Sequence, residues 1–371
     1  MECRKRRHCA SPLGECAGFY NKTMLLEGIF AAITTPFYSD ERVYYRKLEA
    51  NIARYSRSLL AGMVVLGSTG EAPLVDDTET REILRVAADA AAPEKVLIAG
   101  VGRESVKSTV ELALTAVECR YDAILVRPPS YFLKQLSSAA VLHYFRSIAD
   151  RSPLPVIIYN IPQCVPYQIP IELVGELAGH PNMIGIKDSS GKVEWIEALV
   201  AATANVPRRT VPVTQIFEAA TSRMLDHSPE PEPSFVSVGE LTGGAIAAPV
   251  PAIKTRNREV GFQVLCGSGS MVLESLEAGA AGAILGCAAF APQACQEIYL
   301  AWKDHDLALA QEKQRRILEA NRRVVAELGI AGIKYACDFN GYYGGRTRAP
   351  LLGLTAEEKS EIEQILAEVR N

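Results

Sequence analysis

Short apolar runs alternate with longer amphipathic segments along most of this chain. Such runs are typical of buried strands. They predict eight strands: Gly28–Thr34, Met63–Gly67, Val96–Val101, Ala123–Val126, Val156–Asn160, Met183–Lys187, Phe262–Cys266 and Gly282–Leu285. The segments between them carry apolar residues three and four positions apart, as amphipathic helices do. They predict helices over Arg46–Leu60, Thr78–Ala91, Val106–Cys119, Ser137–Asp150, Ile171–Leu177 and Glu194–Ala202.

Strands that alternate with helices indicate an α/β protein built around a parallel sheet. Eight such strands favour a closed (β/α)8 TIM barrel over a doubly wound sheet, and no strand is followed by a GxGxxG turn. We assign this barrel to residues 24–290. Chemistry is then expected at the carboxyl ends of its strands.

Both ends of the chain extend beyond the barrel. Further helical patterns, from Pro292 to Leu328 and from Ala356 to Val369, predict a C-terminal helical domain over residues 291–371. Residues 1–23 are basic and lack the apolar core of a secretory signal, so we expect a disordered extension.

An unusually long gap separates the sixth and seventh predicted strands. Its surplus, at about 205–257, contains the Pro-rich run Ser228–Ser234 and many small residues. Such a composition favours a disordered insertion, either a genuine loop or non-coding sequence carried into the reading frame.

The composition of the chain limits which binding partners and which cell compartment we expect. The chain has 48% hydrophobic and 22% charged residues and a formal net charge of −4, so nucleic acid is not expected as a partner. A membrane is not expected either, because the longest apolar stretches are too short or too interrupted by Gly and charge to span one. Nine scattered cysteines without a CxxC pair indicate a reducing compartment, and the spacing of Cys3, His8, Cys9 and Cys16 matches no standard zinc pattern. We expect a cytoplasmic protein without a zinc site at these four residues. A mitochondrial protein is the alternative, because the first 23 residues are Arg-rich and acid-poor.

A lone lysine, Lys187, ends the apolar run that forms the sixth predicted strand. Lysine is almost never fully buried unless it is paired or has a chemical role, so Lys187 is a candidate Schiff-base nucleophile. The alternative is a lysine that caps the strand and extends its amine to water beside Asp188.

Two other polar features end neighbouring strands. Ser68 and Thr69 lie in a Gly-Ser-Thr-Gly-Glu turn, which either merely connects strand to helix or forms an anion pocket suited to a carboxylate. Tyr159 is either a core aromatic residue or a proton shuttle beside the lysine.

Three motifs together resemble, in order and spacing, a known family. Gly67–Glu71, Tyr159–Pro162 and Gly185–Gly191 are similar to motifs of the dihydrodipicolinate synthase and N-acetylneuraminate lyase family of class I pyruvate aldolases. The resemblance covers Met24 to about Thr203 and Phe262 to the end. It implies a TIM barrel with a C-terminal helical domain that acts on a small 2-oxo acid without a cofactor, as a homo-oligomer (tetramer or dimer).

The resemblance also implies a role for each matching residue. Lys187 would form the iminium with the keto carbon, Tyr159 would relay protons, and Ser68 and Thr69 would hold the carboxylate. Tyr131, in the turn after the fourth strand, aligns with a second relay tyrosine that reaches across a subunit interface in this family.

Two features of the sequence, one residue and one segment, indicate which members of the family the chain most resembles. Cys164 stands where dihydrodipicolinate synthases carry an arginine for the carboxylate of aspartate semialdehyde. Segment 329–351 looks most like 4-hydroxy-2-oxoglutarate aldolases. We therefore expect a lyase that cleaves a 4-hydroxy-2-oxo acid to pyruvate and an aldehyde. The alternatives are the synthase reaction, a sugar-acid aldolase or dehydratase, and a non-catalytic barrel that binds a keto acid.

Overall fold

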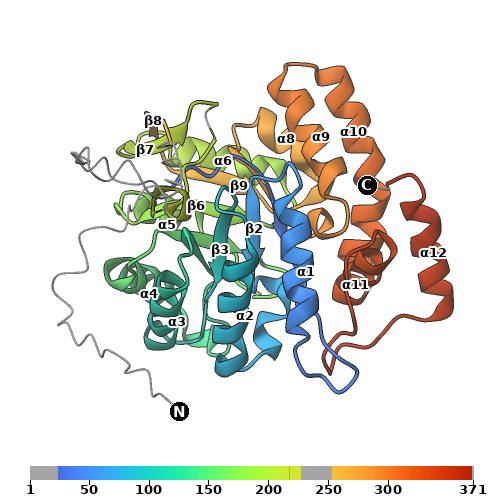
Figure 1. Cartoon of the computed structure of the whole chain (residues 1–371). Coiled ribbons are helices and arrows are strands. Elements are labelled where there is room, and N and C mark those ends of the chain that lie inside the picture. Colours follow the sequence, from blue (N-terminus) through green and yellow to red (C-terminus); the bar gives the residue numbers. More distant parts are fainter. Residues whose placement is uncertain (1–23, 217, 227–252, 370–371) are drawn as a thin grey trace, which may run out of the picture.

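A closed barrel of parallel strands forms the centre of the computed structural model, which describes residues 24–216, 218–226 and 253–369 (Figure 1). The prediction of a (β/α)8 barrel is confirmed. Around the barrel the strands follow the order β1-β10-β9-β6-β5-β4-β3-β2. Their bounds are β1 (Gly28–Ala32), β2 (Gly62–Val65), β3 (Val96–Gly100), β4 (Ala123–Val126), β5 (Val156–Asn160), β6 (Met183–Asp188), β9 (Gln263–Cys266) and β10 (Gly282–Leu285).

Amphipathic helices surround the strands. Their bounds are α1 (Tyr45–Ser56), α2 (Asp77–Ala90), α3 (Val106–Glu118), α4 (Ser138–Arg151), α5 (Ile171–Ala178), α6 (Val193–Ala202) and α8 (Val272–Glu277). Side-chain caps fix several starts: Asp76 and Glu79 form a capping box before α2, and Ser105 and Ser137 cap α3 and α4. The sequence did not predict α8, because six residues are too few to display a helical period.

Alternating side chains of the strands fill two separate layers. Those that point inward, such as Phe30 and Ile157, fill the barrel interior, and those that point outward, such as Ile158, pack under the helices. Such a barrel is filled with side chains, so substrate has access only at its ends.

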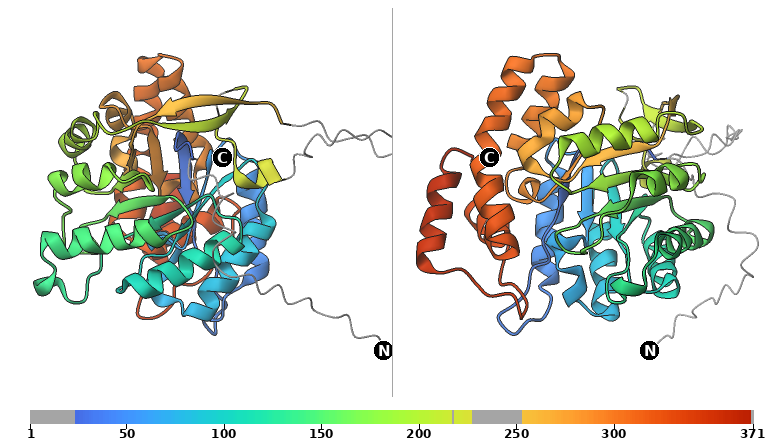
Figure 2. Two further views of the ribbon diagram at one scale, coloured as in Figure 1. Left: turned by 90° about the vertical axis from the view of Figure 1, so that its left-hand side faces the viewer. Right: turned by 180° about the vertical axis from the view of Figure 1, so that it is seen from behind.

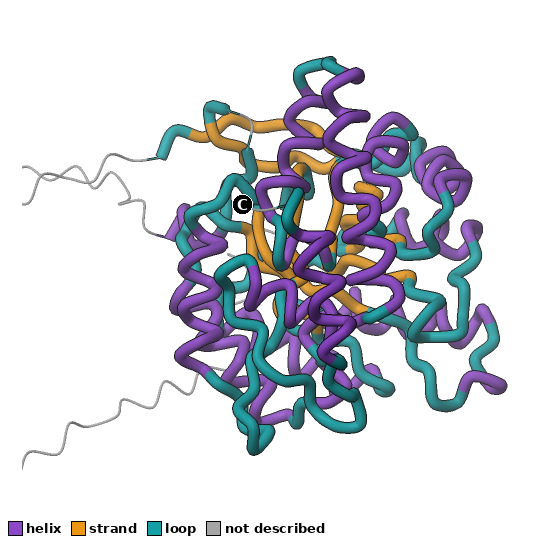
Figure 3. The backbone as a smooth tube through the Cα atoms, turned by 90° about the vertical axis from the view of Figure 1, so that its right-hand side faces the viewer, coloured by secondary structure: helices purple, strands orange, loops and turns teal. Residues whose placement is uncertain are grey.

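The C-terminal helices lie together on one side of the barrel, beside α1 (Figures 1 and 3). They are α9 (Pro292–Lys303), α10 (Leu307–Glu319), the π-helical segment η8 (Ala320–Glu327), α11 (Gly329–Phe339) and α12 (Ala356–Leu366). The predicted run from Pro292 to Leu328 is thus divided, because Asp306 caps a new helix that begins at Leu307 and accepts a hydrogen bond from the Leu309 N–H. The helix α11 was not predicted.

The prediction of a disordered insertion at 205–257 is wrong for its described parts. Strands β7 (Arg209–Thr214) and β8 (Thr255–Val260) form an antiparallel pair, and a short helix α7 (Ser222–Asp226) follows β7. Val211, Val213 and Val260 are buried with Leu25, just before β1, so the pair covers the amino ends of the barrel strands (Figure 2). The period-two alternation of β7 was the missed signal. The run Ser228–Ser234 and residues 1–23 lie outside the described residues.

Polar contacts fasten the insertion to this end of the barrel. The guanidinium of Arg209 donates to the carbonyl of Met24 at 3.1 Å and to Gln263 Oε1 at 3.0 Å. The Ser222 backbone N–H donates to Asp122 Oδ1 at 2.9 Å. Burial lowers the pKa of Arg209 to about 10. These buried contacts explain why a polar segment is ordered here: it satisfies backbone groups at the ends of the strands.

Candidate active site

Lys187 and Tyr159 meet at the carboxyl end of the barrel, as the sequence predicted. In the parallel pairing of β5 with β6 they are partners in register. Lys187 Nζ donates to the Tyr159 hydroxyl at 3.2 Å and lies 4.2 Å from the centre of its ring. Only 4% of Lys187 and 6% of Tyr159 is exposed. The structure therefore rules out a lysine that extends its amine into water.

A buried polar contact joins the carboxyl ends of these two strands, whereas their irregular pairing lies near the amino ends. The register of β5 and β6 shifts between Val156 and Ile157, which marks a β-bulge. Beyond the lysine, Asn160 Nδ2 donates to Asp188 Oδ1 at 2.6 Å. Burial raises the pKa of Asp188, although the hydroxyl of Ser190 donates to this carboxylate at 2.6 Å. The buried contact fixes the two strand ends from which the lysine and tyrosine extend.

The turn after β2 brings a hydroxyl to the same place. Ser68 and Thr69 lie in a 3-10 turn, η2 (Ser68–Gly70), and Ser68 Oγ is 3.5 Å from the Tyr159 hydroxyl. Thr69 is buried beside it. The Thr35 hydroxyl donates to the Gly70 carbonyl at 2.7 Å and holds the turn against the end of β1. Four of the five site residues predicted from the sequence thus lie on adjoining turns and strand ends.

A buried ion pair that the sequence reasoning missed anchors this turn. Glu71 has a left-handed backbone (φ 56°), and its carboxylate lies 2.5 Å from Lys334 Nζ of α11. The side chains of both residues are at most 1% exposed. Burial lowers the pKa of Lys334, and Glu71 opposes this shift. The signal was available, because Lys334, like Lys187, is a lone lysine in an apolar run.

Cys164 and Arg127 complete the polar groups at the mouth. Burial raises the pKa of the Cys164 thiol, whereas Lys187, a hydrogen bond from Ser68 and Arg127 each lower it. Arg127 follows β4 directly, and it lines a small cavity of about 30 Å³ together with Ser68 and Tyr159. Sequence reasoning missed Arg127, because an arginine next to Pro128 resembles an ordinary surface residue.

Tyr131 stands apart from these groups. Its side chain is 80% exposed, and its ring packs edge-on against the ring of Phe132, with the centroids 5.0 Å apart. Its backbone N–H donates to Glu104 Oε2 at 3.0 Å. The structure of one chain does not bring Tyr131 to Lys187, so its assignment stays a prediction.

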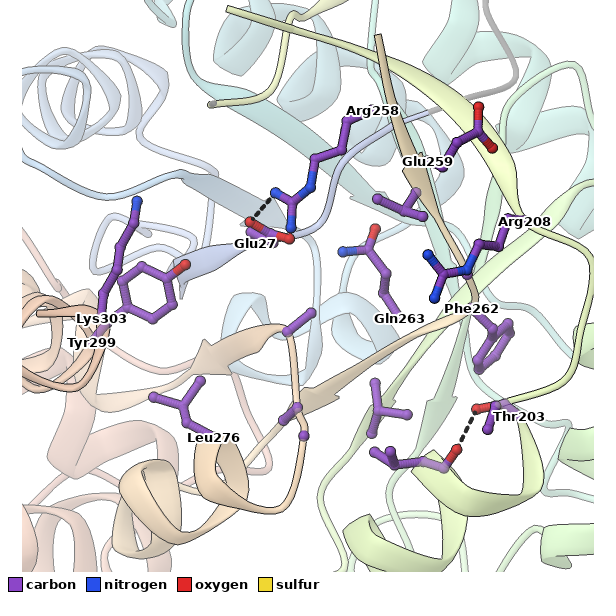
Figure 4. A pocket seen from close by; sticks show the side chains of 18 of the residues that line it. Glu27, Thr203, Arg208, Arg258, Glu259, Phe262, Gln263, Leu276, Tyr299 and Lys303 are labelled. Carbon is purple, nitrogen blue, oxygen red and sulfur yellow. Dashed lines mark hydrogen bonds and ion pairs between the residues drawn. The ribbon is translucent and has the colours of Figure 1, made fainter. Parts of the chain in front are cut away.

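A larger cavity, of about 1050 Å³, lies at the opposite end of the barrel under strands β7 and β8 (Figure 4). Charged groups of both signs line it, and Arg258 is paired with Glu27 at 2.8 Å. It contains neither Lys187 nor Tyr159. Cavity size and the predicted site residues therefore point to opposite ends of the barrel.

The described residues contain neither a metal-binding cluster nor a membrane-spanning helix. No three or more His, Cys, Asp or Glu side chains there are grouped so that they could hold a metal ion, and no helix there is long and apolar enough to cross a membrane. Cys3, His8, Cys9 and Cys16 lie outside those residues.

Comparisons with known proteins agree with the motifs. A model of the dihydrodipicolinate synthetase family matches residues 25–207 and 245–369. The chain is 28% identical, over 93% of its length and 95% of the relative's, to a protein of Emericella nidulans named "Probable 4-hydroxy-2-oxoglutarate aldolase, mitochondrial". It is 27% identical, over 91% of its length and 96% of the relative's, to the 4-hydroxy-tetrahydrodipicolinate synthase of Acidiphilium cryptum.

Solved structures show the same fold. YagE of E. coli K12, crystallised in complex with pyruvate, superposes with a TM-score of 0.73 at 24% identity and covers 93% of this chain and 99% of its own. Dihydrodipicolinate synthase from Aquifex aeolicus gives a TM-score of 0.74 at 22% identity, over 92% and 98% of the two chains.

Proposed function

Because the chain belongs to the dihydrodipicolinate synthetase family, and is therefore a lyase of the pyruvate aldolase type, we propose that it cleaves a 4-hydroxy-2-oxo acid of the 4-hydroxy-2-oxoglutarate type to pyruvate and an aldehyde. The observation that carries this proposal is the buried contact of 3.2 Å between Lys187 Nζ and the Tyr159 hydroxyl. An amine and a proton shuttle in contact are the two groups that imine chemistry needs.

The proposed reaction begins with the attack of the Lys187 amine on carbon 2 of the substrate. The Tyr159 hydroxyl gives its proton to the departing hydroxyl group, so that water leaves and a protonated imine and a Tyr159 phenolate remain. Tyr159 then accepts the proton of the 4-hydroxyl group as the bond between carbons 3 and 4 breaks. The electron pair of that bond moves into the imine and gives an enamine, and the aldehyde leaves. Protonation of carbon 3 and hydrolysis release pyruvate and free the lysine.

The substrate's first carboxylate is assigned to Ser68 and Thr69. Ser68 Oγ lies 3.5 Å from the Tyr159 hydroxyl, so a carboxylate held there would adjoin the carbon that Lys187 attacks. Two hydroxyls and the first N–H groups of a 3-10 turn are donors of the kind that bind carboxylates.

Trapping with borohydride tests the mechanism directly. Pyruvate with borohydride should add a stable mass to the peptide that contains Lys187, and Lys187→Ala should abolish both the adduct and turnover. Lys303→Ala is a matched control, because Lys303 lines the cavity at the opposite end. An adduct on Lys192 or Lys334, or none at all, would overturn the assignment. The absence of any adduct would favour the non-catalytic barrel.

The synthase reaction is the main alternative, because relatives are named for it. Cys164 supports cleavage instead, since a thiol cannot supply the bidentate cation that an arginine offers a carboxylate. We expect cleavage of 4-hydroxy-2-oxoglutarate to have a higher kcat/KM than condensation of pyruvate with aspartate semialdehyde. Cys164→Arg should narrow that difference. Wild-type condensation as efficient as cleavage would refute the substrate assignment while leaving the Schiff base intact.

A homo-oligomer is part of the proposal. Tyr131 and Phe132 are 80% and 64% exposed on one loop, which suits an interface where aromatic side chains gather. Tyr131 would then complete the relay of a second copy. Sedimentation should show a dimer or tetramer, and Tyr131→Phe should slow turnover less than Tyr159→Phe. A fully active monomer would remove Tyr131 from the mechanism.

The location of the protein in the cell, cytoplasmic or mitochondrial, stays a prediction, which microscopy of the tagged protein would test.

A further inference from the structure

The proposed substrate has a second carboxylate, on the carbon next to the cleaved bond, and this part of the site has no assigned partner. The inference below rests on the proposed function, which it deepens by naming the substrate class. Cys164 supplies no positive charge, and the nitrogen of Lys187 is bonded to carbon 2 of the substrate in the imine. Among the described residues that line the small cavity beside Ser68 and Tyr159, Arg127 is the only cation.

We propose that Arg127 binds the second carboxylate and thereby selects short dicarboxylic 2-oxo acids. It directly follows β4, which pairs with β5, the strand of Tyr159. Its charge and that of Lys187 both act on the Cys164 thiol, so the two cations face one small region. Its side chain is 22% exposed, which leaves it accessible and yet partly shielded from water. A charge in such a place attracts a carboxylate more strongly than one on the open surface.

The hydrogen bonds of the guanidinium leave room for a ligand. Its Nη1 donates to the Pro128 carbonyl at 2.9 Å and to Ser130 Oγ at 3.4 Å, and its Nη2 donates to Glu104 Oε1 at 3.0 Å. A guanidinium has five N–H groups. Within the described part of the chain, its Nε and one N–H of Nη2 therefore have no partner. A carboxylate that accepts from two neighbouring N–H groups makes the bidentate contact that arginine favours.

Two neighbouring groups fix Arg127 in this place. A side chain at Gly102 would bring its Cβ to 3.0 Å from Arg127 Cγ and 2.8 Å from the Arg127 backbone nitrogen, so the glycine leaves the space that the arginine fills. Glu104 also accepts from the N–H groups of Ser130 and Tyr131, at 2.8 and 3.0 Å. Its charge is thus shared among several donors, and it orients the arginine without closing it to a ligand.

Chain length explains why this position suits the proposed substrate. In 4-hydroxy-2-oxoglutarate the second carboxylate is three bonds from the carbon that Lys187 attacks. In the condensation product of aspartate semialdehyde it is five bonds away. A cation at the strand end, in the same cavity as Tyr159, fits the shorter chain. Cys164 lies beyond the end of β5, where a longer chain would reach.

The test compares two ligands that differ only in this carboxylate. 2-Oxoglutarate and 2-oxopentanoate have the same chain length, with a carboxylate or a methyl group at the end. Both are trapped on Lys187 with borohydride, and the ligand concentration for half-maximal trapping is measured in wild type, Arg127→Gln and Arg127→Lys. Wild type should prefer 2-oxoglutarate. Arg127→Gln should weaken trapping of 2-oxoglutarate roughly ten- to hundredfold and change 2-oxopentanoate little, as the loss of one charge-assisted hydrogen bond predicts. Arg127→Lys should lie between.

Equal weakening for both ligands would overturn the proposal, because it would show that Arg127 only supports the loop. A preference that persists in Arg127→Gln would overturn it as well. Should Arg127→Gln fail to fold, Arg127→Lys decides, since an unchanged preference there contradicts a bidentate contact.

This trapping experiment does not depend on cleavage. Failure of the proposed function would appear separately, as wild-type protein that traps both ligands but cleaves neither 4-hydroxy-2-oxoglutarate nor its methyl analogue, 4-hydroxy-2-oxopentanoate. Where both are cleaved, Arg127→Gln should lower kcat/KM for 4-hydroxy-2-oxoglutarate alone.

Discussion

The two ends of the barrel contain cavities of opposite character. At the amino end, a wide cavity of about 1050 Å³ is lined by charged side chains that are partly paired with one another, such as Glu27 with Arg258. At the carboxyl end the space is small, yet the Tyr159 hydroxyl lies 3.2 Å from Lys187 Nζ and 3.5 Å from Ser68 Oγ. The two ends thus offer different indications of where chemistry occurs, and converging, buried polar groups are a more specific indication than cavity size.

Removing a hydroxyl at each end gives the sharpest contrast. Tyr159→Phe should slow turnover by about 10²–10⁴, the scale of losing a positioned acid or base. Tyr299→Phe is the matched control, since Tyr299 lines the opposite cavity, and it should leave turnover unchanged. Steady-state assays with circular dichroism as a fold check measure both. Near-normal activity of Tyr159→Phe would make it an ordinary core aromatic residue.

The ion pair behind the serine turn should affect both stability and binding. Lys334→Met leaves the carboxylate of Glu71 buried without its cation, which typically costs about 3–5 kcal/mol. We expect a lower free energy of unfolding in urea and weaker binding of pyruvate, because Glu71 ends the turn that carries Ser68. The variant Lys334→Met with Glu71→Gln should recover part of the stability. Wild-type behaviour of the single variant would show that the pair is not needed to hold the turn.

The strand pair at the amino end should affect stability alone. Val211→Ala removes two methyl groups from a fully buried position, at a cost of about 1–3 kcal/mol in the free energy of unfolding. The kcat/KM should stay within about twofold of wild type, as for sites that share no contacts. Chemical denaturation and steady-state assays check this. A fall in kcat/KM without a fall in stability would mean that the two ends are coupled.

The amino-acid sequence by itself determined the barrel and where most of the candidate site residues lie. Each strand is a short apolar run between helical patterns, so its position follows from local periodicity. Lys187 and Tyr159 could be placed at one mouth because parallel strands of a barrel end at the same edge. The strand pair β7–β8 was missed, because a Pro-rich neighbouring segment obscured an alternation only a few residues long.

Only the tertiary structure decided which distant residues support the site. Lys334 meets Glu71 across more than half the chain, and no periodicity relates residues on different elements. Arg127 is one of many charged residues in the sequence, and only its place beside Tyr159 and Gly102 distinguishes it. Local pattern fixes an element and the face it buries, whereas a contact between elements depends on how the whole chain closes, because it is the packing of the barrel that brings their ends together.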